Sequence, residues 1–288
     1  FPGAVETFCI ETMMQDRKAL QAGTSHFLGQ NFAKSSDIKF QSFEEKEEYA
    51  WTTSWGASTR LIGGIIMMHG DDDGVILPPR VASSHVVFIP IYRSPDDKPK
   101  VMEYIHKIAM ELKSVFYCNR KIRVEIDDRD TGGARGWEWI KKGIPLRVEI
   151  GPRDMSQDSV YVARRDKPHR EKISMKRDFF VKEITIILDE IQNNLYEKAV
   201  SFKEKNTLPV DGGKAFYEYF TPMNKEHPEI HGGFALSHWC GAGECEAKIK
   251  EDLSVTVRCI PLTQEKEKGK CVCCGRPSSG RVIFAKAY

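Results

Sequence analysis

The stretch Thr53-Ser54-Trp55-Gly56-Ala57-Ser58-Thr59-Arg60-Leu61-Ile62-Gly63-Gly64-Ile65-Ile66-Met67-Met68-His69-Gly70 decides the fold of the N-terminal part of the chain. A strand-like run over 49–54 leads into it, and the apolar run that follows stops at a glycine, which suits a helix C-terminus. Ser58 or Thr59 can cap this helix, so Arg60 is expected in its first turn, beside backbone N–H groups that lack partners. The arrangement predicts a site for an anionic ligand with a flat ring.

Composition limits the classes of protein that fit. The 288 residues have room for two or three domains, and 41% apolar with 29% charged residues is typical of globular chains. The net charge of +2 is too small to indicate a nucleic-acid binder, so any RNA surface must be a local patch. We find neither an apolar run long enough for a membrane span nor a signal peptide, and expect a cytoplasmic protein without membrane contact.

Five of the eight cysteines fall between residues 240 and 274. A C-x4-C pair and a C-x2-C-G pair supply two thiolate pairs, which is what tetrahedral zinc requires, in a reducing compartment. The expected ligands are Cys240, Cys245, Cys271 and Cys274. Cys273 competes with Cys274 for the fourth position, and His238 is a weaker rival. Four thiolates leave no open position, so the predicted zinc is structural.

Strands and helices alternate in the middle of the chain, which predicts a small α/β domain with a mostly parallel sheet. We expect strands over 86–91, 123–126, 146–150 and 160–165, and helices over 101–117, 137–142 and 179–196. Elsewhere we expect helices over 6–20 and 215–220, a solvated connector or hairpin over 33–48, and a turn rather than a cation site at 71–74.

The opening stretch resembles motif 3 of a class II aminoacyl-tRNA synthetase, specifically a prolyl-tRNA synthetase of the archaeal and eukaryotic type. Residues 54–63, 67–71 and 77–82 match the family's S-W-G-x-[ST]-T-R-x-I-G, M-x-H-G-D and L-P-P-R-V-A segments, and residues 19–32 match its loop and strand around T-S-H. The resemblance implies that ATP is bound by Gln21, Thr24, Ser58 and Arg60, with Arg60 as the catalytic cation stacked on adenine. It also implies a proline pocket lined by Phe1 and His26.

Residues 128–154 resemble the class IIa anticodon-binding domain, above all in the segment 142–154. The resemblance implies anticodon contacts from Arg147, Arg153 and Asp154. Arginine forks suit guanine edges, and the proline anticodon carries two guanines. One departure is that Ile140 stands where the family commonly has a glutamate, so that contact cannot be carried over.

The last block resembles the C-terminal zinc domain of the same family, including an aromatic tail that ends in Tyr288 and packs toward the catalytic domain. The implied fold class is multidomain, α/β and α+β. Its parts are the end of a class II antiparallel-sheet catalytic domain (1–82), an anticodon-binding domain (83–197) and a small α+β zinc-binding domain (198–288).

The implied activity is that of a proline–tRNA ligase, which activates L-proline with ATP and Mg²⁺ and transfers it to tRNA(Pro). The implied enzyme is a homodimer through its catalytic domain. Motifs 1 and 2 of class II enzymes are not found, so we expect the C-terminal portion of a longer protein, inactive alone. The alternatives are a non-catalytic tRNA-binding module, and a class IIa synthetase for threonine, glycine or histidine.

Overall fold

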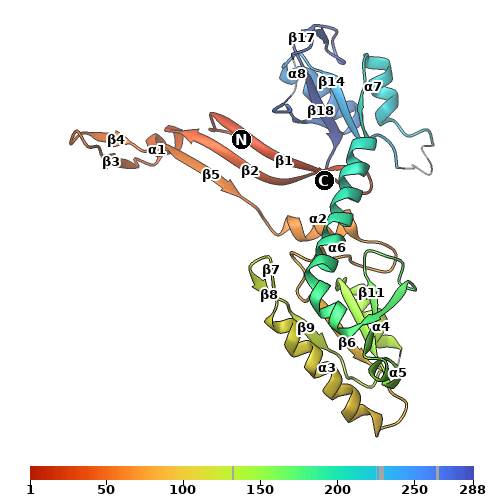
Figure 1. The fold of residues 1–288 in the computed structure, drawn as a ribbon. Coiled ribbons are helices and arrows are strands. Elements are labelled where there is room, and N and C mark those ends of the chain that lie inside the picture. Colours follow the sequence, from red (N-terminus) through yellow and green to blue (C-terminus); the bar gives the residue numbers. More distant parts are fainter. Residues whose placement is uncertain (132, 225, 227–229, 264–265) are drawn as a thin grey trace. The chain divides into compact units, whose positions relative to one another are not determined.

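The computed structural model describes residues 1–131, 133–224, 226, 230–263 and 266–288 (Figure 1). The chain forms two compact units, one made of Phe1–Met68 with Phe202–Tyr288 and the other of His69–Ser201. Most of the first and third predicted domains therefore share one unit, whereas residues 69–82 and 198–201 belong to the other. The division at 82/83 and 197/198 stays a prediction.

The N-terminal part of the first unit is an antiparallel sheet in the order β1-β2-β5 (Figure 1). Its elements are β1 (Glu6–Met13), β2 (Ala19–Gly29), α1 (Asn31–Ser35), β3 (Lys39–Gln41), β4 (Glu47–Tyr49), β5 (Thr52–Gly56) and α2 (Arg60–His69). The predicted strand, the helix that starts at Arg60 and the hairpin within 33–48 are confirmed.

The helix predicted over 6–20 is wrong. This segment forms β1 and the turn into β2, with Glu6 opposite Phe27 and Met13 opposite Ala19. Phe8 and Ile10 alternate with polar residues, which is the period of a strand, and pairing with β2 overrides the partial helical stripe.

The second unit is built on a five-stranded sheet in the order β12-β11-β10-β6-β9. Its elements are β6 (Val86–Pro90), α3 (Asp97–Ser114), β7 (Phe116–Tyr117), β8 (Arg120–Lys121), β9 (Val124–Ile126), α4 (Ala134–Lys141), β10 (Leu146–Ile150), α5 (Pro152–Ser156), β11 (Ser159–Arg164), β12 (Lys172–Lys176) and α6 (Arg177–Lys205), which runs on past Ser201.

Both faces of this sheet are covered. Val86 and Phe88 of β6 lie in a core with side chains of α3 and α6, whereas Val87 and Ile89 pack with Trp139 of α4. All five β6 residues are buried, which explains the continuous apolar run that predicted this strand.

The prediction of a mostly parallel sheet is wrong, because two of the four strand pairings are antiparallel. β6 pairs in parallel with β10 and β9, but β10 and β11 are separated by only the segment 151–158. A parallel crossover needs a dozen residues or more, so β11 must return antiparallel. That segment contains the short helix α5.

The C-terminal part of the first unit has a four-stranded sheet in the order β13-β14-β18-β15. Its elements are β13 (Thr207–Pro209), α7 (Gly213–Phe220), β14 (Phe234–His238), α8 (Gly243–Leu253), β15 (Val255–Cys259), β16 (Gly269–Lys270), β17 (Pro277–Ser278) and β18 (Arg281–Lys286). Its core centres on Phe216, whose ring lies 5.1 Å from that of Phe220 and 5.0 Å from that of Phe284.

The N- and C-terminal parts of the first unit are joined by apolar and ionic contacts. Met13 and Ala19 share a buried cluster with residues of β14 and β18. Arg258 on β15 forms an ion pair with the buried Glu11 of β1 at 3.0 Å. The Tyr288 N–H donates to the Ala19 carbonyl, as expected for a tail that packs on the N-terminal sheet.

Among the residues described, we find no helix that combines the length and the apolar character needed to cross a bilayer.

Candidate functional site

A cavity of about 330 Å³ opens on the N-terminal sheet of the first unit. It is lined by Phe1, Gln21, Ala22, Gly23, Thr24, His26, Ser54, Trp55, Gly56, Ala57, Ser58 and Arg60. All six residues assigned to ATP or proline from the sequence are in this set. The structure therefore brings together side chains from the N-terminus, β2 and the start of α2.

The pairing of β2 with β5 positions the backbone that lines the cavity. β2 pairs with β5 so that Thr24 lies opposite Gly56, and the chain then turns into α2. The Ser58 hydroxyl accepts a hydrogen bond from the Arg60 backbone N–H at 3.3 Å, so Ser58 caps the N-terminus of α2.

The Arg60 side chain is held at the cavity. Its Nη1 donates to the backbone carbonyl of Gln21 at 3.3 Å, which ties the guanidinium to the start of β2. The residue is otherwise exposed, so its flat face and remaining N–H groups are accessible to a ligand.

Phe1 and His26 form the aromatic wall. Their rings stack with centroids 4.3 Å apart and an angle of 28° between planes. His26 is 9% exposed, and its Nδ1 lies 3.0 Å from the Thr7 hydroxyl. Because Thr7 engages Nδ1, the other nitrogen is the one available to a ligand. The sequence analysis did not assign a role to Thr7 or to Trp55, which lines the same cavity.

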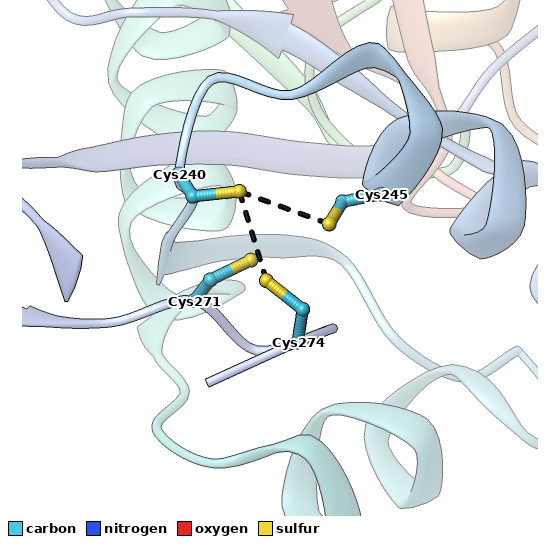
Figure 2. A group of neighbouring side chains, drawn as sticks. All are labelled: Cys240, Cys245, Cys271 and Cys274. Carbon is cyan, nitrogen blue, oxygen red and sulfur yellow. Dashed lines mark hydrogen bonds between the residues drawn. The ribbon is translucent and has the colours of Figure 1, made fainter. Parts of the chain in front are cut away.

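The four predicted cysteine ligands converge at one point (Figure 2), and their sulfur atoms all lie within 4.8 Å of one another. The Sγ of Cys240 is 3.7 Å from that of Cys245 and 3.8 Å from that of Cys274. A tetrahedral zinc with bonds of about 2.3 Å requires sulfur–sulfur edges of about 3.8 Å, so the spacing fits this ion.

Three segments of the C-terminal part supply the four thiols. Cys240 follows β14 and Cys245 lies in the first turn of α8. Cys271 and Cys274 lie in the turn between β16 and β17, where the Gly275 N–H donates to the Cys271 carbonyl and Gly275 takes a φ of 74°. This left-handed conformation favours glycine and explains the residue that ends the C-x2-C-G pattern.

Neither rival is one of the four side chains whose ligand atoms all lie within 4.8 Å of one another, although the Cys273 thiol also contacts that of Cys245. Cys273 is partly buried and packs against the core around Phe216. The His238 ring contacts the Ser278 hydroxyl through Nδ1 at 3.3 Å and lies 3.8 Å from a Glu267 carboxylate oxygen through Nε2.

Arg276 contacts the sulfurs and was not found from the sequence, although it directly follows C-x2-C-G. Its Nε donates to the Cys274 sulfur at 3.2 Å and its Nη2 to the Cys245 sulfur at 3.7 Å. The guanidinium lowers the pKa of Cys274 to about 6, whereas burial raises the pKa of Cys245. Four thiolates around one Zn²⁺ would carry two net negative charges, of which the Arg276 guanidinium would offset one.

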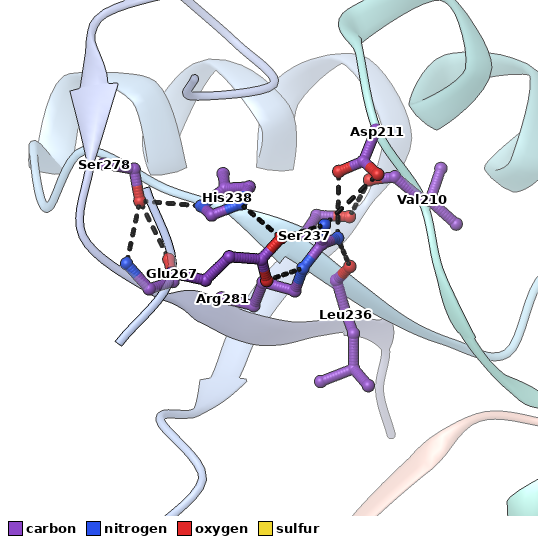
Figure 3. A network of polar contacts seen from close by, with 9 residues as sticks. Val210, Asp211, Leu236, Ser237, His238, Glu267, Ser278 and Arg281 are labelled. Carbon is purple, nitrogen blue, oxygen red and sulfur yellow. Dashed lines mark hydrogen bonds and ion pairs between the residues drawn. The ribbon is translucent and has the colours of Figure 1, made fainter. Parts of the chain in front are cut away.

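A polar network holds the segment that carries the second cysteine pair (Figure 3). Arg281 of β18 donates from Nε to Glu267 at 2.7 Å and forms an ion pair with Asp211 at 2.9 Å. Its Nη1 also donates to the Leu236 carbonyl of β14 at 2.9 Å. The network links the residues just before β16 to β14. It thereby helps to place Cys271, which directly follows β16, beside the other three cysteines.

The three predicted anticodon residues occupy different environments in the second unit. Arg147 is 8% exposed and contacts Glu149 at 3.4 Å, so it lies in the interior rather than on the surface. Arg153 is exposed at the start of α5. Asp154 accepts a hydrogen bond from the Gly151 N–H at 2.9 Å and therefore stabilises the N-terminus of α5. Ile140 is buried in α4.

The second unit also contains a buried carboxylate to which the sequence analysis assigned no role. Asp127, at the end of β9, accepts hydrogen bonds from Arg129 Nε at 2.9 Å and from Trp139 Nε1 at 2.7 Å. The Arg129 guanidinium holds the pKa of Asp127 far below its usual 3.8.

We expect Asp127→Asn to destabilise the second unit by about 1–3 kcal/mol at pH 7, because the ion pair with Arg129 becomes a hydrogen bond between a guanidinium and a neutral amide. A carboxyl with a lowered folded-state pKa stabilises the fold above its unfolded pKa, and this stability is lost as pH falls through the folded value. Urea unfolding between pH 7 and pH 2.5 should therefore show a steeper acid loss in wild type than in the variant. Asp128→Asn, at an exposed neighbour, is the control; equal slopes for Asp127→Asn and wild type would contradict the assignment.

Two family models match separate segments of the chain. A family model described as "Prolyl-tRNA synthetase, C-terminal" matches residues 225–288, and one described as "Anticodon binding domain" matches residues 85–186. The chain is 50% identical over 289 residues to a proline–tRNA ligase of Bdellovibrio bacteriovorus and 51% identical over 293 residues to proline–tRNA ligase 2 of Anaeromyxobacter dehalogenans. Both matches cover 100% of this chain and 57% of the relative, so the chain spans little more than half the length of these relatives.

The structure is similar to a crystal structure of prolyl-tRNA synthetase from Cryptosporidium parvum complexed with L-proline and AMP. The TM-score is 0.84 at 32% identity, covering 100% of this chain and 59% of that one. A second structure of the Cryptosporidium enzyme, complexed with halofuginone and AMPPNP, matches at the same TM-score with 33% identity. The predicted resemblance is confirmed: over its whole length the chain is similar to the C-terminal portion of prolyl-tRNA synthetases, and it matches the family models of an anticodon-binding domain and of the prolyl-tRNA synthetase C-terminal domain.

Proposed function

We propose that this chain is part of a proline–tRNA ligase. In the first step the proline carboxylate attacks the α-phosphorus of ATP and releases pyrophosphate. In the second step a hydroxyl at the 3′ end of tRNA(Pro) attacks the activated carbonyl and releases AMP. The supporting observation is the single cavity that holds every residue assigned to the two small substrates.

Arg60 is the cation that we assign to the nucleotide. A guanidinium tethered to the Gln21 carbonyl presents its face to a purine and its charge to the phosphates. Gln21, Thr24 and Ser58 supply neutral hydrogen-bonding groups around the same ligand, and Mg²⁺ accompanies ATP. Positioning and charge stabilisation carry this chemistry without a nucleophilic side chain.

Phe1 and His26 are the residues that we assign to proline. A saturated five-membered ring needs an apolar wall, which the Phe1 ring supplies. The stacked His26, oriented by Thr7, turns its free nitrogen to the polar end of the amino acid. In the Cryptosporidium structure the enzyme is complexed with L-proline and AMP, the ligand pair that this cavity is proposed to accept.

The remaining groups of the active site are expected in the rest of the whole protein. The relatives are nearly twice as long as this chain, and the class II motifs that bind the α-phosphate and form the dimer are not among its residues. We infer a cytoplasmic homodimer that pairs through the catalytic domain. The four-cysteine cluster is proposed to hold a structural Zn²⁺, which fastens α8 to the turn between β16 and β17 and takes no part in the reaction.

The exposed Arg153 is the residue that we assign to the tRNA anticodon, with Asp154 holding the turn beneath it. We expect Arg153→Ala to weaken tRNA(Pro) binding about tenfold or more, since one arginine contact to a base is worth ~1–3 kcal/mol. Filter binding of tRNA(Pro) at fixed salt measures this, with Arg120→Ala, exposed on β8, as the control. Equal losses in both variants would show a general charge effect instead.

Proline-dependent ATP–pyrophosphate exchange by the full-length protein tests the proposal. We expect exchange with proline and none with threonine, glycine or histidine. Exchange with one of the others would assign the enzyme to another amino acid. No exchange, with tRNA still bound, would favour the non-catalytic module, although such a module has no use for the nucleotide cavity.

A further inference from the structure

A second cavity of about 240 Å³ lies in the first unit, apart from the nucleotide cavity and the cysteine cluster. One wall is the β1–β2 turn, with Arg17 and Lys18. The other is the C-terminal part, with His231 and Lys286. The volume is several times that of one water molecule in the liquid, about 30 Å³. Nothing in the proposed reaction uses these residues.

Arg17 contributes a cation to the wall of the cavity. It sits in the turn with a φ of 63°, and its backbone N–H donates to the Met14 carbonyl, so the backbone is fixed. Its side-chain Nε is shielded from the cavity and has no hydrogen-bond partner among the described residues, so the rest of the side chain is what lines the cavity. No carboxylate among the described residues forms an ion pair with this guanidinium, whose charge is therefore available to an anionic ligand.

Lys286, on the last strand, faces the same space. Its Nζ lies 2.9 Å from His231 Nε2, and this nitrogen also lies 3.0 Å from the Phe220 carbonyl oxygen. One imidazole nitrogen cannot donate to a carbonyl and accept from an ammonium at once. Burial and the nearby Lys18 both lower the pKa of Lys286, as expected for a cation without a compensating charge.

Asp16, the carboxylate that lines this cavity, does not compensate the charges of Arg17 and Lys286. Asp16 Oδ2 accepts a hydrogen bond from the Tyr288 hydroxyl at 2.5 Å and forms an ion pair with Lys18 at 3.0 Å. It thus neutralises Lys18, and among the described residues it makes no hydrogen bond or ion pair with Arg17 or Lys286. Two cations, one from each wall, are left facing a common space.

We propose that this cavity is a binding site for a phosphate-type oxyanion, held between Arg17 and Lys286. A tetrahedral anion offers acceptors in several directions, so it can accept hydrogen bonds from Arg17, Lys18 and Lys286 together. It would link the β1–β2 turn to the last strand. The same chemistry is offered by free inorganic phosphate or pyrophosphate and by a phosphodiester of an RNA strand.

Titration of the full-length protein with inorganic phosphate, followed by calorimetry and by the thermal unfolding midpoint, tests the site. Arg17→Asn keeps a residue that tolerates positive φ, and Lys286→Gln replaces the ammonium by a neutral polar amide on a shorter side chain. We expect each to weaken phosphate binding about tenfold or more, as for loss of one charge-assisted hydrogen bond, and to abolish the rise of the midpoint with phosphate. Lys214→Gln, which removes a highly exposed lysine from the same unit, is the control and should match wild type.

Two comparisons separate this site from the nucleotide cavity and identify the source of the anion. Phosphate binding should persist in Arg60→Ala, so a failure of the proposed ATP site would leave this test intact. Competition by pyrophosphate at concentrations where a short RNA oligonucleotide does not compete would assign the site to a free ion, and the reverse to RNA. No phosphate binding by wild type, or equal binding by wild type and both variants, would overturn the proposal.

Discussion

Arg60→Ala in the full-length enzyme should slow proline activation by about 2–4 kcal/mol of transition-state stabilisation, a loss of roughly 10²–10³ in rate. The guanidinium is exposed in the cavity and anchored by one hydrogen bond to the Gln21 carbonyl, so truncation removes a ligand group without opening a buried core. The effect should therefore fall on ATP use and not on folding.

Pyrophosphate exchange at saturating proline, with ATP varied, measures this loss. Arg60→Lys is the matched variant, because it keeps the charge but not the flat fork, and we expect it to recover only part of the rate. Unchanged melting behaviour for both variants would locate the effect in the site. An activation rate equal to wild type in Arg60→Ala would remove Arg60 from the nucleotide site.

Cys240→Ser should empty the metal site and unfold much of the C-terminal part of the first unit. Cys240 is central to the cluster, with contacts to two of the other sulfurs, and a three-thiolate remainder cannot close a tetrahedron. Structural zinc contributes folding free energy directly, on the order of 10 kcal/mol in small zinc domains, so this loss should exceed that of any surface change.

Metal analysis of purified protein, prepared without chelators, measures this directly. We expect one zinc per chain in wild type and close to none in Cys240→Ser, with a lower unfolding midpoint. Cys273→Ser is the matched control, since Cys273 lies beside a ligand but packs on the core, and should keep its zinc. Loss of zinc from Cys273→Ser with retention in Cys274→Ser would make Cys273, and not Cys274, the fourth ligand. A wild-type protein without zinc would refute the proposed metal site.

The sequence predicted elements best where a local signal and burial agree. The run at 86–91 is apolar on both faces because helices cover both sides of β6, and the stop at Gly70 follows directly after the end of α2. The four cysteines that converge were predicted because a tetrahedral metal site requires closely spaced pairs. Spacing alone could not choose between Cys273 and Cys274, which depends on the turn that Gly275 makes.

Long-range pairing accounts for the errors. The segment 6–20 carries apolar residues at both helical and alternating positions, and β2 decides between them through the register from Glu6–Phe27 to Met13–Ala19. The direction of β11 follows from the short connection after β10. Contacts such as those of Arg276 with the sulfurs and of Asp127 with Trp139 join residues whose proximity depends on the tertiary fold.

The most direct test of the central claim is a crystal structure of the full-length protein with a non-hydrolysable prolyl-adenylate analogue. We predict the purine stacked on the Arg60 guanidinium and the pyrrolidine ring against Phe1 and His26, in the cavity formed by β2, β5 and the start of α2. An analogue bound elsewhere, with Arg60 and His26 contacting only solvent or protein, would contradict the account.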